Sequence, residues 1–215
     1  MSDTSQNKKL ALRKKKVMEF CQQMQANGYV LHELTVSTET ANSVAVIASL
    51  PFIILYVVAF GCIAGWKEYM NVNMGMLGTS IFVSIVIHEL IHGFFFGLFA
   101  PHKFRSVEFG IFWKSLNPYC YCSEPVSKVQ YLTALTMPGI LLGAVVGTVA
   151  LGMHSSTWLL FSLVEFLMAS GDFFVAFKIF RFGKQGDKAL FQDHPDLPGL
   201  LVFTKKEGTS LGIEL

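Results

Sequence analysis

The sequence predicts an all-α membrane protein with four transmembrane helices and a cytoplasmic-side β-hairpin loop between helices 2 and 3. Composition is the first reason, because 52% of the 215 residues are hydrophobic and only 15% are charged. The second is the presence of four apolar stretches of about 20 residues, the length that a helix needs to cross a bilayer. The third is the placement of Lys and Arg, which gather in alternate connections between those stretches.

The four predicted spans divide the chain into three parts. A basic N-terminal segment, 1–43, precedes a four-helix transmembrane domain, 44–180, and a C-terminal tail, 181–215, follows it. The first and third spans contain no charged residue, whereas the second and fourth contain acidic groups. The spans are predicted at about 44–66, 76–100, 132–153 and 157–180.

The charge distribution predicts the orientation of these spans. Lys and Arg precede the first span, fill the loop between the second and third, and follow the fourth. The two other connections contain only Lys67. Since Lys and Arg concentrate on the cytoplasmic side, both termini and the middle loop are expected in the cytoplasm. The predicted location is therefore the cell membrane, multi-pass, with the bacterial inner membrane as the expected compartment.

The N-terminal segment predicts an amphipathic helix over residues 5–26. Val17, Cys21 and Met24 share one of its faces, and Lys residues populate the rest. We expect this helix to lie on the inner surface of the lipid bilayer, where Lys side chains meet anionic lipid. Nucleic acid is not expected as a partner, because no other feature of the sequence supports it.

The loop 101–130 is too long for a plain connector. Hydrophobic and other residues alternate over 107–114 and again over 118–122, which predicts a β-hairpin at the membrane boundary beside the second span. In the tail, the prolines of Asp193-His194-Pro195-Asp196 indicate a turn, so that cluster is interpreted as structural.

Span 3 contains a glycine at every fourth position. Gly139, Gly143 and Gly147 therefore share one helix face, which allows a neighbouring helix to approach closely. Pro138, just before them, is expected to kink the span.

The second span contains the motif His88-Glu89-Leu90-Ile91-His92. In a helix, His88 and His92 project from the same face one turn apart, so both imidazoles can reach one Zn²⁺. Glu89 is rotated by about 100° from His88 and can address a water on the metal, as the general base does in zincins. A buried carboxylate costs about 3 kcal/mol in a bilayer, so its presence here favours a function.

A catalytic zinc needs a third protein ligand, and depth in the membrane favours Asp172. Spans 2 and 4 run in the same direction, with the histidines 12 and 16 residues after the start of span 2 and Asp172 15 residues after the start of span 4. Glu165 lies only 8 residues after that start, about 9 Å farther outward. Glu165 is the second candidate ligand. Its alternatives are a position that lines a polar cleft, or a protonated side chain packed between helices.

The sequence resembles the bacterial putative zincin peptidases, which are small multi-pass membrane proteins similar in layout to site-2 proteases. The resemblance depends on HELIHG in a span, NPYCYCSEP in the loop, MPG, and SGDFFVAFKI in the final span. It implies His88, His92 and Asp172 as zinc ligands and Glu89 as the catalytic residue. The chain lacks the Asn and the second Gly of the N-x-x-D-G pattern that supplies the Asp of site-2 proteases.

The predicted function is a membrane-embedded zinc metalloprotease that hydrolyses peptide bonds of membrane-associated proteins through zinc-activated water. Its expected partners are a membrane-protein or peptide substrate and the lipid bilayer. The alternative is a metal-binding membrane protein without hydrolase activity, either a transporter or a pseudoprotease scaffold. The absence of a visible internal repeat disfavours transport, and the intact Glu89 disfavours a pseudoprotease.

Overall fold

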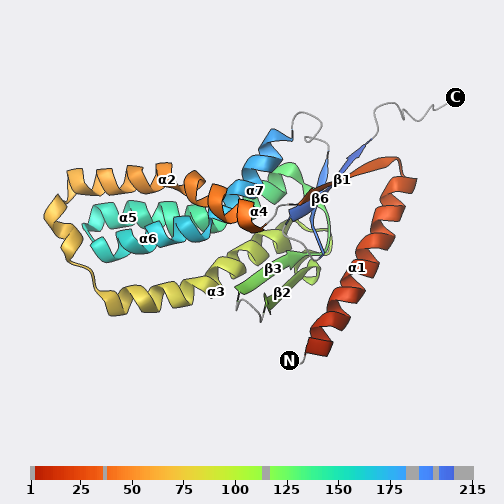
Figure 1. The fold of residues 1–215 in the computed structure, drawn as a ribbon, viewed down its shortest axis with the longest axis horizontal. Coiled ribbons are helices and arrows are strands. Elements are labelled where there is room, and N and C mark those ends of the chain that lie inside the picture. Colours follow the sequence, from red (N-terminus) through yellow and green to blue (C-terminus); the bar gives the residue numbers. More distant parts are fainter. Residues whose placement is uncertain (1–2, 36–37, 113–116, 183–188, 196–198, 206–215) are drawn as a thin grey trace.

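The computed structural model describes residues 3–35, 38–112, 117–182, 189–195 and 199–205, and it is mostly helical. Helices run alongside one another through one half of the molecule, while the strands and the N-terminal helix gather at the other end (Figure 1). The helices are α1 (Asp3–Ala26), α2 (Thr38–Ile63), α3 (Met74–Phe99), α4 (Lys128–Pro138), α5 (Val146–Met153), α6 (Ser156–Met168) and α7 (Ser170–Arg181). Shorter helical segments are η1 (Trp66–Met70), η2 (Lys103–Ser106) and the π-helical η3 (Gly139–Val145).

The strands form two sheets, so the all-α prediction was wrong. The segments predicted to pair after the second span do so, as an antiparallel sheet of β2 and β3 in which Phe109 faces Cys120; their connection, 113–116, lies outside the described residues. A four-stranded antiparallel sheet of order β1-β6-β5-β4 was not predicted. The strands are β1 (Tyr29–Thr35), β2 (Val107–Phe112), β3 (Asn117–Cys122), β4 (Val126–Ser127), β5 (Leu190–Asp193) and β6 (Gly199–Lys205).

Helix α1 forms where the sequence predicts it, but protein rather than lipid covers its apolar face. Val17 and Met24 are buried against Leu201 and Phe203 of β6. The expected contact of this face with lipid is therefore corrected, because the tail strands provide its apolar partner; the position of the helix at a membrane surface stays a prediction. Helix α1 also contacts the sheet of β2 and β3 through Arg13, whose guanidinium lies 3.9 Å from the centre of the Tyr121 ring.

Among the described residues, two helical stretches are long and apolar enough to cross a membrane, Met74–Phe99 and Lys128–Met153. The pair α6 and α7 passes the same test as one broken span, bent by 48°. These three match the second, third and fourth predicted spans. In α2 the described apolar portion that the test finds, Ser49–Ile63, is shorter than a span, so the first span stays a prediction.

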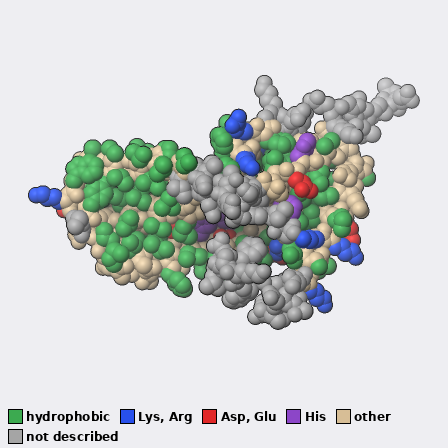
Figure 2. Space-filling view, viewed as in Figure 1, with side chains coloured by type: hydrophobic (Ala, Val, Ile, Leu, Met, Phe, Trp, Pro, Cys, Tyr) green, Lys and Arg blue, Asp and Glu red, His purple; other side chains and the backbone are tan. Residues whose placement is uncertain are grey.

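The surface of the helical half is apolar. Hydrophobic side chains cover it in Figure 2, whereas most of the visible charged side chains lie toward the end that carries the sheets. On α3 the stripe Phe82, Val86 and Leu90 is more than half exposed. Exposed apolar area on this scale is typical of a surface that meets lipid.

The opposite stripe of α3 is buried and polar. Ser84, His88 and His92 follow one another at intervals of four residues, so they occupy one face of the helix. Next along the chain, Gly93 leaves room for the hairpin, because a Cβ there would lie 2.2 Å from the Phe109 ring of β2. This close approach brings β2 and β3 against the helix that carries the motif.

The glycines of the third span pack as predicted. A Cβ on Gly139 would lie 2.5 Å from the ring of Phe173, and one on Gly147 would lie 2.7 Å from that of Tyr56. Directly after Pro138 the helix widens into η3, a π-helical segment; the kink expected at Pro138 stays a prediction. Such segments occur frequently at functional sites.

Candidate metal centre

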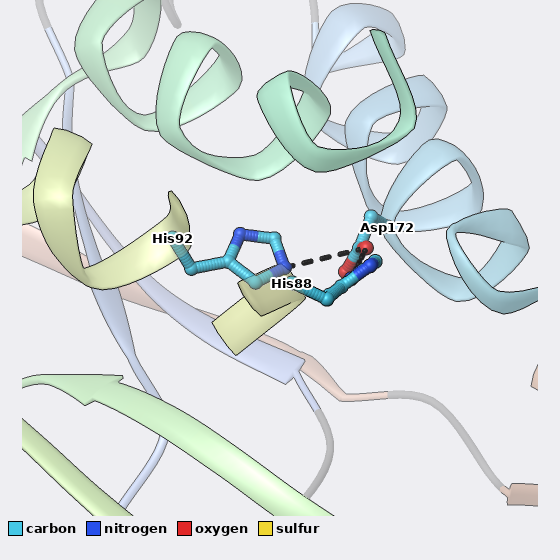
Figure 3. A group of neighbouring side chains, drawn as sticks. All are labelled: His88, His92 and Asp172. Atoms are coloured by element: carbon cyan, nitrogen blue, oxygen red, sulfur yellow. Dashed lines mark hydrogen bonds and ion pairs between the residues drawn. The ribbon is translucent and has the colours of Figure 1, made fainter. Parts of the chain in front are cut away.

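Three side chains from two helices converge on one another (Figure 3). His88 and His92 come from α3, Asp172 comes from the first turn of α7, and their candidate ligand atoms all lie within 4.8 Å of one another. The Nε2 atoms of His88 and His92 lie 3.2 and 3.4 Å from Oδ2 of Asp172. Both histidines are buried, and Asp172 is partly buried.

The spacing of these atoms fits a tetrahedral zinc ion. Bonds of about 2.0–2.1 Å at tetrahedral angles place neighbouring ligand atoms about 3.3 Å apart. The two separations from the Asp172 oxygen are close to this value. The donor set of two imidazoles and one carboxylate is also of the kind that catalytic zinc sites use.

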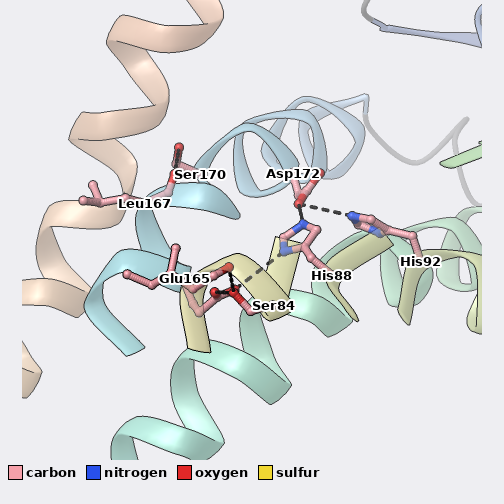
Figure 4. A network of polar contacts seen from close by, with 8 residues as sticks. Ser84, His88, His92, Glu165, Leu167, Ser170 and Asp172 are labelled. Atoms are coloured by element: carbon pink, nitrogen blue, oxygen red, sulfur yellow. Dashed lines mark hydrogen bonds and ion pairs between the residues drawn. The ribbon is translucent and has the colours of Figure 1, made fainter. Parts of the chain in front are cut away.

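The remaining nitrogen of each imidazole faces an acceptor, which supports the same assignment. His92 Nδ1 lies 2.9 Å from the carbonyl oxygen of Ala134 in α4. On His88, Nδ1 points toward Glu165, on the side of the ring opposite Asp172 (Figure 4). A proton on Nδ1 leaves the lone pair on Nε2 available for a metal.

The break between α6 and α7 brings Asp172 to the histidines. The chain bends after α6, and the hydroxyl of Ser170 donates to the carbonyl oxygen of Leu167 at 2.6 Å, which satisfies an acceptor at the end of α6. Asp172 then falls in the first turn of α7, where a negative charge is favourable. Broken helices are tolerated at membrane depth where they line a polar cavity.

Glu165 lies on the other side of His88 and is not one of the three converging residues. It is fully buried, and its Oε1 accepts a hydrogen bond of 2.5 Å from Ser84 Oγ. Its Oε2 lies 3.8 Å from His88 Nδ1. The comparison of depths in the sequence and the geometry of the structure therefore agree. Both favour Asp172 as a candidate ligand over Glu165, which lies behind the His88 ring.

Glu89 is half-buried and lines a cavity of about 460 Å³ together with His88, His92 and Asp172. Apolar side chains, among them Phe96, form other parts of the wall. The carboxylate thus shares the space of the candidate ligands without being one of them, as the sequence predicts for a general base.

Two residues in the wall of this cavity were missed by the sequence interpretation. Tyr131 of α4 and Asp193 of β5 both line it, and the Tyr131 hydroxyl donates a hydrogen bond to Asp193. Burial raises the pKa of Asp193, although hydrogen bonds from Cys122 and Tyr131 oppose the shift. The prolines after Asp193 gave a correct reason to expect a chain reversal but no sign that its carboxylate faces inward.

A second polar group lies outside the helical half, at the start of the hairpin. Glu124 accepts hydrogen bonds from Ser106 Oγ, from the His102 backbone N–H at 3.0 Å and from the His102 ring. Partial burial alone would raise the pKa of Glu124, but these donors together lower it below the ordinary value. This group closes the loop that leads from α3 into β2.

The apolar helical frame and the buried His-His-Asp group define the class, a helical protein of membrane character with a candidate metal centre. Residues 81–186 match the model of the family described as "putative zincin peptidase". The matched segment contains the motif and Asp172, and it confirms the resemblance stated from the sequence. No curated protein and no solved structure matches the chain.

Proposed function

We propose that the protein is a membrane-embedded zinc metallopeptidase that hydrolyses peptide bonds of membrane-associated proteins. The convergence of the His88 and His92 Nε2 atoms on Asp172, in a cavity that Glu89 also lines, carries this proposal. The family match supports the general class, a metallopeptidase.

The roles of the residues follow from their positions. His88, His92 and Asp172 would hold the zinc, which would polarise the scissile carbonyl and lower the pKa of a water molecule toward neutrality. Glu89, whose carboxylate lines the same cavity, would accept a proton there and would deliver it to the leaving amine. The Ala134 carbonyl behind His92 holds the ring in the tautomer that leaves Nε2 unprotonated.

The edge of β3 opposite β2 offers a place for an extended substrate. The Ser123 N–H donates to Ser106 on the β2 side, whereas the Cys122 N–H donates to Asp193 on the other side. Backbone groups alternate in direction along a strand, so the Cys120 N–H points away from β2 as well, toward the Glu89 carboxylate, and an added strand would have to replace this contact. Since Cys120 also lines the cavity, a locally unwound substrate segment can add to β3 beside Glu89 and the ligands.

The proposal includes a multi-pass arrangement with four spans and both termini in the cytoplasm. The lipid-like surface of the helical half and the Lys and Arg placement support it. In this arrangement the metal centre lies within the membrane-spanning helices, near their cytoplasmic ends, and the hairpin lies at that boundary.

Paired measurements of zinc and cleavage test the function. Wild type, Glu89→Gln and the exposed control Glu68→Gln are purified, assayed for bound zinc, and incubated in vesicles with a panel of single-span membrane proteins. We expect near-stoichiometric zinc in all three and cleavage only in wild type and Glu68→Gln. Absence of zinc from wild type would exclude the metal centre, whereas zinc without cleavage of any panel member would favour the non-hydrolytic alternative.

A further inference from the structure

We infer that Asp193 is a positioning residue of the metal cavity, through which the tail strand β5 holds the cavity-lining edge of β3 in place. The significance of this inference rests on the proposed function, because β3 is the proposed substrate-binding strand. Strand β5 lies beyond the family-matched segment 81–186, so the match assigns no role to it.

Asp193 joins two walls of the cavity. Its Oδ2 accepts a hydrogen bond of 2.7 Å from the backbone N–H of Cys122 at the end of β3. Its Oδ1 accepts from the hydroxyl of Tyr131 in the second turn of α4. A carboxylate has two oxygens that only accept, so a single side chain can hold two donors from separate elements.

The strand that carries Asp193 is itself fixed. β5 pairs with β6 along Leu190–Asp193 and with β4 at Phe191, and Phe191 is fully buried. The neighbouring Gln192, which is 1% exposed, donates from Nε2 to the Ser123 carbonyl at 2.7 Å. Two consecutive side chains of β5 therefore hold two consecutive backbone groups where β3 ends.

Burying the Asp193 carboxylate here costs free energy, and a residue that only filled space would not need a carboxylate. Burying an acidic group is unfavourable unless hydrogen bonds compensate for lost water, and hydrophobic side chains surround this position in the adjoining core. Asp193 recovers part of that cost by holding Cys122 and Tyr131. The arrangement is therefore better explained by a requirement for the position of β3 than by core packing.

This contact also limits where a substrate can bind. Because the Cys122 N–H already donates to Asp193, an added strand can pair with β3 only up to Cys120. The substrate backbone is thereby directed to the part of β3 that lines the cavity with Glu89. Asp193 thus fixes the register of the substrate rather than the metal.

The reactivity of the Cys122 thiol provides a test that needs no substrate. Cys122 is 1% exposed, and burial, together with the charge of Asp193, raises the pKa of its thiol to about 12. Full-length wild type, Asp193→Ala, Asp193→Asn and Glu33→Ala are treated with N-ethylmaleimide in detergent at neutral pH. Peptide mass spectrometry then gives the labelling rate of Cys122, and zinc content is measured in parallel. Glu33 is an exposed carboxylate of β1, in the same sheet, and Glu33→Ala serves as the matched control.

We expect Asp193→Ala to raise the labelling rate of Cys122 about tenfold or more, because the end of β3 opens more often. Asp193→Asn removes the charge that raises the thiol pKa but keeps an acceptor for Cys122 and a polar partner for Tyr131, so its rate rises only through the lower thiol pKa and stays well below that of Asp193→Ala. Zinc content stays equal in all four proteins, since no candidate ligand is changed.

Equal labelling of Asp193→Ala and Glu33→Ala would overturn the inference, and so would an Asp193→Asn rate as high as that of Asp193→Ala. If Asp193→Ala does not fold, Tyr131→Phe removes one of the two hydrogen bonds alone, and an unchanged Cys122 rate in that variant would likewise overturn it. The zinc content of wild type tests the metal centre of the proposed function separately. The proposed function and the positioning role of Asp193 can therefore fail independently.

Discussion

The Nδ1 atom of His88 lies 3.8 Å from Oε2 of Glu165, and both atoms are buried with no hydrogen-bond partner among the described residues. Two unsatisfied polar atoms facing each other in an apolar helical region are unfavourable as they stand. A metal on Nε2 of His88 favours a proton on Nδ1, and this N–H would then donate to the Glu165 oxygen.

We therefore predict that Glu165→Met lowers zinc affinity by about 10–100-fold, the usual effect of losing an outer partner of a ligating histidine. Ser84 keeps an acceptor in the Ile81 carbonyl, at 2.9 Å, so only His88 loses its partner. Affinity is measured by competition with a chromophoric chelator. Without metal, the variant should be as stable as wild type or more stable, because a buried polar group without a full set of hydrogen bonds is gone; unchanged zinc affinity would instead identify Glu165 as a packing residue.

Asp172→Ala is predicted to weaken zinc binding more than any change at Glu165, by more than about 100-fold, because it removes a candidate ligand and not an outer partner. The same chelator competition compares Asp172→Ala with Glu165→Ala. The opposite order of affinities would exchange the assignments of the two acids.

Gly139→Ala is predicted to destabilise the protein by about 1–3 kcal/mol, a typical cost of overpacking. The new Cβ would lie 2.9 Å from Cβ of Ala169, where α6 meets α7, and the α7 segment that carries Asp172 would have to shift. Zinc occupancy should fall together with the thermal unfolding temperature measured in detergent.

Gly152 provides the matched control for this change. A Cβ at Gly152, in α5 of the same span, meets nothing within 4 Å. Gly152→Ala should be neutral or stabilising by up to about 1 kcal/mol, since alanine is the better helix former. Equal losses in both variants would show that the close contact at Gly139 does not position α7.

Glu124→Gln is predicted to loosen the loop that leads into β2, by about 1 kcal/mol at pH 7. Because the pKa of Glu124 is lowered in the fold, its stabilisation is present above the ordinary carboxyl range and is lost as the pH falls through the lowered value. Hydrogen exchange of residues 102–124 should therefore separate wild type from the variant at pH 7 and show a shrinking difference in acid. A difference that grows on acidification would contradict the assigned direction.

The site could be predicted largely from sequence because its signals are local. The i, i+4 spacing determines that His88 and His92 share a helix face, and hydropathy locates the spans closely enough to match the depth of Asp172. Ser84 follows the same spacing of four, one turn before His88, and that periodicity could have identified it as part of the buried polar face.

The four-stranded sheet could not be predicted in the same way. β1 pairs with β6, which lies far away in the sequence, and Tyr29 stands opposite Lys205. No local sequence pattern predicts such a long-range pairing. The apolar face of α1 was assigned to lipid for the same reason, since its true partner is the distant Phe203. The inward direction of Asp193 depends on this pairing as well.

The pairing of β1 with β6, and of β4 with β5, has a consequence for topology. Strands hydrogen-bonded in one sheet must lie on one side of a bilayer, so the chain must cross it an even number of times between any two of them. Among the described residues between β1 and β4, only α2 and α3 are long helices, so if α3 crosses then α2 is expected to cross too. The same rule applies between β4 and β5: if the α4–α5 stretch crosses the bilayer, the α6–α7 pair is expected to cross it too. If α3 and the α4–α5 stretch both cross the bilayer, four is therefore the smallest number of crossings that agrees with a sheet closed by residues from both ends of the chain.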